Sequence, residues 1–199
     1  VMDGQHRKLA ADKRSDIATL PCLIFDMTGQ AEEATTFVAL NSNKAGVPSV
    51  DRFRAMLVAG DASARGVQEM LASTGHKVGY SASSKTVACI QCLWKLYRKD
   101  AALLKRVWPI ISDTSINHPI VDVLVRAVVG CEQKLVAMGD SVINPPYRPA
   151  LINAGAAVLV AAIRRELTIV GIGGERVETA ALAKWLNNKR LGVKRKISV

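Results

Sequence analysis

Five consecutive polar residues near the start of the chain have the types and spacing of a phosphate-binding turn. These residues are Asp3, Gly4, Gln5, His6 and Arg7. Val1 and Met2 read as the end of a strand, and a helix is predicted over Gln5 to Ala11. Glycine lets a phosphate approach the backbone, a helix start offers N–H groups and partial positive charge, and an arginine fork matches phosphate oxygens. The pattern predicts an anion site, with one alternative: Asp3 caps the helix and Arg7 forms a surface ion pair.

The same run, followed by Leu9-Ala10-Ala11, resembles the DGQHR form of the ParB/sulfiredoxin superfamily, in which ParB proteins carry a Gly-Glu-Arg-Arg-x-Arg-Ala box. A second segment agrees in order and spacing. Phe37 and then Asn41-Ser42-Asn43-Lys44 fall where ParB proteins carry Glu-Asn-x-x-Arg. The resemblance covers roughly residues 1–60. It implies a small mixed α/β domain that binds a nucleoside triphosphate, CTP or ATP, together with Mg²⁺.

The resemblance adds Asn41 and Lys44 to the predicted nucleotide site, where they would contact the same phosphates as Asp3 to Arg7. From the residues alone, Asn41 is equally well explained as a helix C-cap and Lys44 as a solvated lysine. Leu40 departs from the ParB box, which has glutamate at this position. We therefore expect binding without turnover, and keep NTPase or nuclease-like phosphodiesterase activity as the enzyme alternative.

Composition limits the class of protein and suggests its partners. The chain has 199 residues, of which 49% are hydrophobic and 22% charged, so it is globular rather than disordered. The longest apolar stretch, Ala150 to Ile163, is too short to span a bilayer. Lys and Arg exceed Asp and Glu by 27 to 17, a net charge of +10, which favours polyanionic partners. Four cysteines in a chain without a secretory signal do not imply disulfides and fit a reducing cytoplasm, and the resemblance implies a bacterial host.

The order of predicted elements indicates an α+β protein. The N-terminal part, residues 1–60, would be a partial ParB-like domain with a buried strand over Leu20 to Asp26 and helices over Ala31 to Asn41 and from Ser49 to Gly60. Because the motif begins at Val1, we expect further strands to precede it. Residues 61–199 have helical periodicity and form the second predicted domain.

Several features of the second domain have competing interpretations. Two helices between Ala62 and Tyr97 form either a DNA-binding helix–turn–helix or a pair that only packs in the core, and the long link predicted over His76 to Ala82 favours packing alone. Cys89 and Cys92 are predicted to lie inside a helix that Ser83-Ser84 begins, which favours core cysteines over a redox pair. A helix is predicted to open at Pro119, another over Ala150 to Leu167, and a simple turn at Gly171 to Gly174.

The C-terminal segment is basic and contains no acidic residue after Glu178. Its candidate DNA-binding residues are Lys189, Arg190, Lys194, Arg195 and Lys196. Such a segment would bind phosphates with counterion release, or it is a solvated helix end that binds nothing. The resemblance implies a nucleotide-binding, DNA-associated protein of phage or mobile-element type, with a homo-oligomer as an option. The alternatives are a ParB-like nuclease and a non-catalytic interaction protein that retains the fold.

Overall fold

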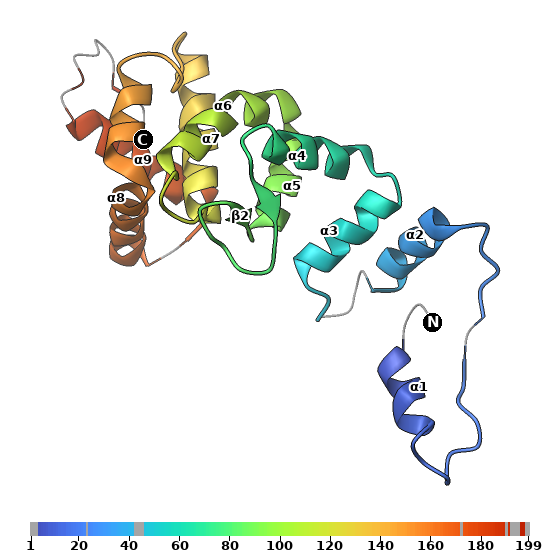
Figure 1. The fold of residues 1–199 in the computed structure, drawn as a ribbon. Helices are drawn as coiled ribbons and strands as arrows, with labels where there is room; N and C mark the ends of the chain where they lie inside the picture. Colours follow the sequence, from blue (N-terminus) through green and yellow to red (C-terminus); the bar gives the residue numbers. More distant parts are fainter. Residues whose placement is uncertain are drawn as a thin grey trace. The chain divides into compact units, whose positions relative to one another are not determined.

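A computed structural model describes residues 4–22, 24–41, 46–171, 173–189, 191 and 196–197. The chain divides into two compact units, an N-terminal unit of Val1–Ala64 and a C-terminal unit of Arg65–Val199. The sequence placed this boundary between residues 60 and 61. Figure 1 shows helices throughout the described part of both units, with one short pair of strands. An α+β class with a helical majority fits this content, while no described feature identifies a ParB-like sheet.

The N-terminal unit contains α1 (Gln5–Ala11), α2 (Gln30–Asn41) and α3 (Ser49–Val58). Helix α2 begins where the Glu32 carboxylate accepts hydrogen bonds from the backbone N–H and hydroxyl of Thr28, both at 2.7 Å. Helices α2 and α3 pack together, and Phe53 of α3 is fully buried. Helices α2 and α3 have the positions that the apolar spacing and first-turn acids predict, and α1 has its predicted bounds although its first turn contains no acidic residue.

The buried strand predicted over Leu20 to Asp26 is wrong. The described residues of this stretch are irregular, and the side chains of Ile24 and Phe25 are 90% and 45% exposed. A strand must pair its backbone groups with a neighbouring strand, and no other described segment of this unit is a strand. An apolar run without such a partner cannot be buried as a sheet.

The C-terminal unit is a helical bundle arranged around one central helix. It contains β1 (Lys77–Val78), β2 (Thr86–Val87), α5 (Ile90–Lys99), α6 (Ala101–Thr114), α7 (Asp122–Ala137), α8 (Tyr147–Val170) and α9 (Glu175–Asn188), and α4 (Ala62–Ala72) spans the boundary between the units. Helix α7 packs against α5, α6, α8 and α9 (Figure 1). Its apolar face explains this position, since Leu124, Val128 and Leu135 are buried.

Three helix starts in this unit differ from prediction. Ser83-Ser84 does not begin a helix, because Thr86 and Val87 pair in parallel with Lys77 and Val78 and α5 starts only at Ile90. Helix α7 begins after the extended residue Val121 rather than at Pro119. Helix α8 begins earlier than expected, at Tyr147, and is broken at Gly155, whose φ of 73° is non-helical.

Candidate functional site

The predicted phosphate-binding turn places a glycine and an arginine side by side at the start of α1. Gly4 has φ 87° and ψ 12°, a left-handed conformation that glycine adopts without strain, and its carbonyl accepts the Lys8 N–H at 2.9 Å. The Arg7 side chain folds back over it: a Cβ built on Gly4 would lie 3.3 Å from Arg7 Nη2. Any larger residue at position 4 would therefore displace the guanidinium. Asp3 lies outside the described residues.

The other side chains of this turn point to solvent. Gln5, His6 and Arg7 are all exposed, and α1 adds exposed Lys8, which pairs with Asp12 at 2.8 Å. The start of α1 therefore offers an accessible guanidinium, an imidazole and a carboxamide beside the helix N–H groups. These groups are donors that suit an anionic oxygen.

Asn41, the second part of the predicted site, is placed differently. The residue is 5% exposed, and its Nδ2 donates to the Phe37 carbonyl at 2.8 Å, one turn back in α2. Its carboxamide would have to leave this hydrogen bond to reach a phosphate. Lys44 lies outside the described residues. Of the predicted site residues that are described, Gly4 and Arg7 lie side by side and Gln5 and His6 between them are exposed, whereas the Asn41 amide is engaged within α2.

The described part of the basic C-terminal segment is held close to α9. Lys189 Nζ lies 4.8 Å from the centre of the Trp185 ring, and Lys196 is exposed. The Asn187 carboxamide binds both backbone groups of Ile197, at 3.0 and 2.9 Å, and the Ile197 side chain is buried. The chain therefore returns to α9 at its end. Arg190, Lys194 and Arg195 lie outside the described residues.

Cys89 is the N-cap residue of α5 and Cys92 lies in its first turn, so the prediction that both lie in a helix interior is wrong. The Cys89 thiol donates to the Ile120 carbonyl at 3.5 Å. Burial raises the pKa of Cys89 to about 12 and that of Cys92 to about 11. Both thiols therefore stay protonated and weakly nucleophilic near neutral pH. Cys131 is buried, Cys89 and Cys92 are partly exposed, and Cys22 is exposed.

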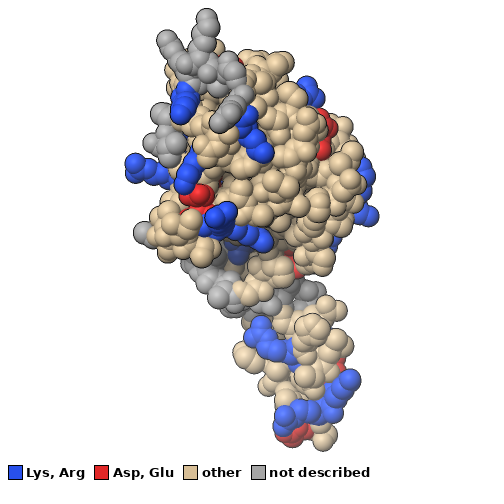
Figure 2. Space-filling model, turned by 90° about the vertical axis from the view of Figure 1, so that its left-hand side faces the viewer, with Lys and Arg blue, Asp and Glu red and all other residues tan. Residues whose placement is uncertain are grey.

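A basic surface with two aromatic residues runs along α5 and the start of α6. We call it the α5–α6 surface and define it by Trp94, Lys95, Tyr97, Arg98 and Lys105. Its three cations are exposed, and its two aromatic residues are partly exposed. This surface was not predicted from the sequence, although aromatic and basic residues alternate in this stretch. On the face of the molecule shown in Figure 2, Lys and Arg lie scattered among uncharged residues and Asp and Glu are few.

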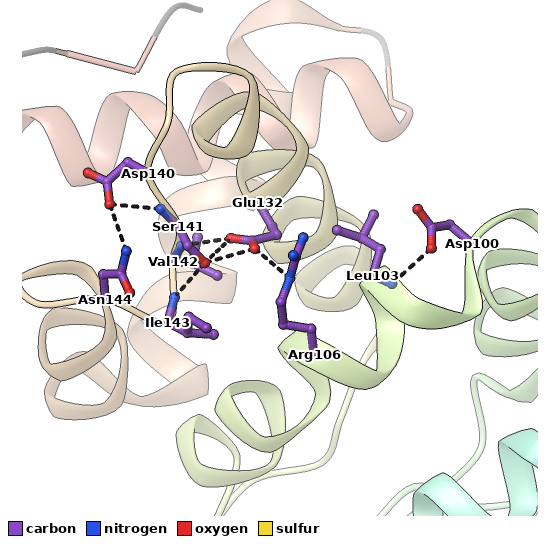
Figure 3. A network of polar contacts seen from close by, with 9 residues as sticks. All are labelled: Asp100, Leu103, Arg106, Glu132, Asp140, Ser141, Val142, Ile143 and Asn144. Atoms are coloured by element: carbon purple, nitrogen blue, oxygen red, sulfur yellow. Dashed lines mark hydrogen bonds and ion pairs between the residues drawn. The ribbon is translucent and has the colours of Figure 1, made fainter.

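Two buried carboxylates hold the helices of the C-terminal unit together. Glu132 of α7 is fully buried; it forms an ion pair with Arg106 Nε at 2.9 Å and accepts hydrogen bonds from Ser141 Oγ at 2.8 Å and the Val142 N–H at 2.7 Å (Figure 3). Glu178 of α9 receives both arms of the Arg126 guanidinium, at 2.6 and 2.7 Å. These carboxylates are saturated by protein donors, so they serve structure rather than chemistry on a ligand.

A hollow of about 440 Å³ lies between the end of α6 and the break in α8. Its polar lining comes from Asp113, Thr114, Asn117 and His118, and Gly155 lies opposite. Arg148 already pairs with Asp113 at 3.3 Å. The Asp113 carboxylate is therefore already engaged, and the described residues that line the hollow include no lysine or arginine.

The described part of the chain contains neither a candidate metal site nor a candidate membrane span. No three or more of its described His, Cys, Asp or Glu side chains are placed so that they could hold a metal ion together. None of its described helices has both the length and the apolar composition of a bilayer-spanning segment. No protein-family model, curated protein or solved structure matches this chain significantly.

Proposed function

We propose that this chain is a nucleotide-binding, DNA-associated protein of the ParB-like type. The observation that carries the proposal is the start of α1, where the left-handed Gly4 and the guanidinium of Arg7 lie together and Gln5 and His6 are exposed. A phosphate at this turn would meet helix N–H groups and a forked cation, the combination that phosphate-binding loops use. The net charge of +10 supports a second, larger polyanionic partner.

The proposed ligand is a ribonucleoside triphosphate such as CTP or ATP, with Mg²⁺ bridging its phosphates. Arg7 and the N–H groups of the turn would hold the phosphates, and Lys44 and a reoriented Asn41 would complete the site. Hydrolysis is proposed to be slow or absent, because Leu40, 40% exposed at the end of α2, replaces the acidic residue of the ParB box. The expected behaviour is binding without turnover.

Titration calorimetry of the full chain with each ribonucleoside triphosphate and Mg²⁺ tests the nucleotide site. Arg7→Ala should weaken binding by about 1.5–3 kcal/mol, the scale of a charge-assisted hydrogen bond, which is roughly a 10- to 150-fold rise in Kd. Lys13→Ala is the matched control, because Lys13 is an exposed cation just beyond α1. Equal affinity of the Arg7 and Lys13 variants, with helix content unchanged by circular dichroism, would remove the site from the start of α1.

A further inference from the structure

The α5–α6 surface has a local excess of positive charge. Between Trp94 and Arg106 the chain carries five cations, Lys95, Arg98, Lys99, Lys105 and Arg106, and one acid, Asp100. The Asp100 carboxylate is engaged as the cap of α6, where it accepts the Leu103 N–H at 2.8 Å. No described cation forms an ion pair with it, so it offsets only one of the five positive charges of this stretch.

Only some of these cations have acidic partners. Lys99 pairs with Glu175 at 3.6 Å, and Arg106 pairs with the buried Glu132. Among the described residues, no acidic side chain pairs with Lys95, Arg98 or Lys105. Three exposed positive charges thus lie uncompensated on one pair of consecutive helices, at an energetic cost unless an anion binds there.

Two aromatic rings fix the positions of two of these charges. The Arg98 guanidinium carbon lies 5.9 Å from the centre of the Trp94 ring, and Lys105 Nζ lies 5.5 Å from that of Tyr97. Tyr97 is itself fixed, since its hydroxyl packs against Gly66 of α4 so closely that a Cβ there would overlap it. Cations held on rings lose less conformational freedom when they meet a phosphate than solvated ones do.

We propose that the α5–α6 surface binds the phosphate backbone of duplex DNA, a proposal that rests on the DNA association proposed above and locates it. Lys95 and Arg98 are three residues apart in α5, a rise of about 4.5 Å. Over that length duplex DNA presents roughly three phosphate charges. The two exposed cations of this turn, with Lys105 of α6 held at the Tyr97 ring, therefore suit a row of closely spaced phosphates. The contacts are to phosphates, so they position the protein on DNA without selecting a sequence.

The test compares two triple variants of equal charge loss in the full chain. The first is Lys95→Gln/Arg98→Gln/Lys105→Gln, which neutralises the surface. The control is Arg164→Gln/Arg165→Gln/Arg176→Gln, which removes three exposed cations from α8 and α9 that also lack a described acidic partner. Duplex affinity is measured by fluorescence anisotropy at several salt concentrations, and thermal melting confirms that both variants are folded.

The surface variant should reduce the slope of log affinity against log salt by roughly 2 to 3, because each of the three lost phosphate contacts contributes about 0.9. The control variant should change this slope by less than about 1. Equal slopes for the surface variant and the unmodified chain overturn the proposal, as do equal reductions in the surface and control variants. Polyglutamate that displaces DNA from the unmodified chain at equal charge concentration also overturns it, because the surface would then accept any acidic polymer. If the surface fails while the unmodified chain still binds DNA steeply with salt, the proposed function survives and only its location is wrong.

Discussion

Replacing the buried carboxylate of Glu132 should weaken the C-terminal unit by about 2 kcal/mol. This carboxylate forms an ion pair with Arg106, accepts hydrogen bonds from Ser141 and Val142, and holds α6 and the turn after α7 against the central helix. A hydrogen bond to a charged group contributes about 1.5–3 kcal/mol, against about 1 kcal/mol for a neutral one. Glu132→Gln preserves the shape and one acceptor oxygen but weakens both hydrogen bonds and the ion pair, by about 1 kcal/mol each on this scale.

Two effects offset part of this loss. The Arg106 side chain is 42% exposed, so its released guanidinium regains water, and a neutral amide costs less to bury than a carboxylate. Arg106→Gln should cost at least about 1 kcal/mol, because it leaves a buried carboxylate without its cation. The neighbouring exposed Lys105 is the control, and Lys105→Gln should cost no more than about 0.5 kcal/mol.

Urea unfolding followed by tryptophan fluorescence suits this test. The three tryptophans, Trp94, Trp108 and Trp185, all lie in the C-terminal unit, so the signal reports the unit that contains Glu132. The difference in midpoint at constant m-value gives the change in unfolding free energy. A Glu132→Gln protein that unfolds at the same or a higher urea concentration than the unmodified chain would refute the reasoning.

Further predictions concern thiol reactivity, acid stability and helix packing. At pH 7, N-ethylmaleimide should modify the exposed Cys22 rapidly and Cys89, Cys92 and Cys131 only slowly, because the pKa values of these three thiols are raised. Mass spectrometry of the folded protein counts the labels on each chain, and rapid addition of two or more labels would contradict this prediction. Burial lowers the pKa of His76 below its usual value of 6.5, so the folded state favours the neutral imidazole. The melting temperature should therefore fall as pH drops below about 6.5 and through the folded pKa, and this decline should be smaller in His76→Gln. Gly130→Ala should lower stability by about 1–3 kcal/mol in urea unfolding, despite the better helix propensity of alanine, because its methyl group would overlap Thr179 of α9.

Local patterns predicted the helices well where apolar spacing and first-turn chemistry agreed. Helices α1, α2 and α4 have nearly the predicted bounds, and the turn at Gly171 ends α8 as its glycine suggested. Predictions failed where non-local pairing decides the outcome. Thr86 and Val87 pair with Lys77 and Val78, which their neighbours in the sequence do not predict. The apolar run at Ile24 has no described strand to pair with.

The candidate site was predictable only in part, for a related reason. The residue types at Gly4 and Arg7 indicated a glycine turn beside a cation, and both lie together at the helix start. The hydrogen bond of Asn41 to its own helix could not be predicted, because cap, back-bonding and ligand roles use the same carboxamide. The α5–α6 surface was not predicted, because helical spacing gives no sign that Tyr97 packs on Gly66 with its ring close to Lys105.

The salt dependence of duplex DNA binding tests DNA association most directly, and replacing the basic C-terminal residues makes the test more specific. Because Asn187 binds the backbone of the buried Ile197, truncation would damage α9, so the five basic residues from Lys189 to Lys196 should be changed to Gln instead. The unmodified chain should lose affinity steeply as the salt concentration rises. In the five-residue variant the slope of log affinity against log salt should be smaller, by about 0.9 for each lost phosphate contact. An unmodified chain that does not bind the duplex, or binds it equally at all salt concentrations, would contradict the account.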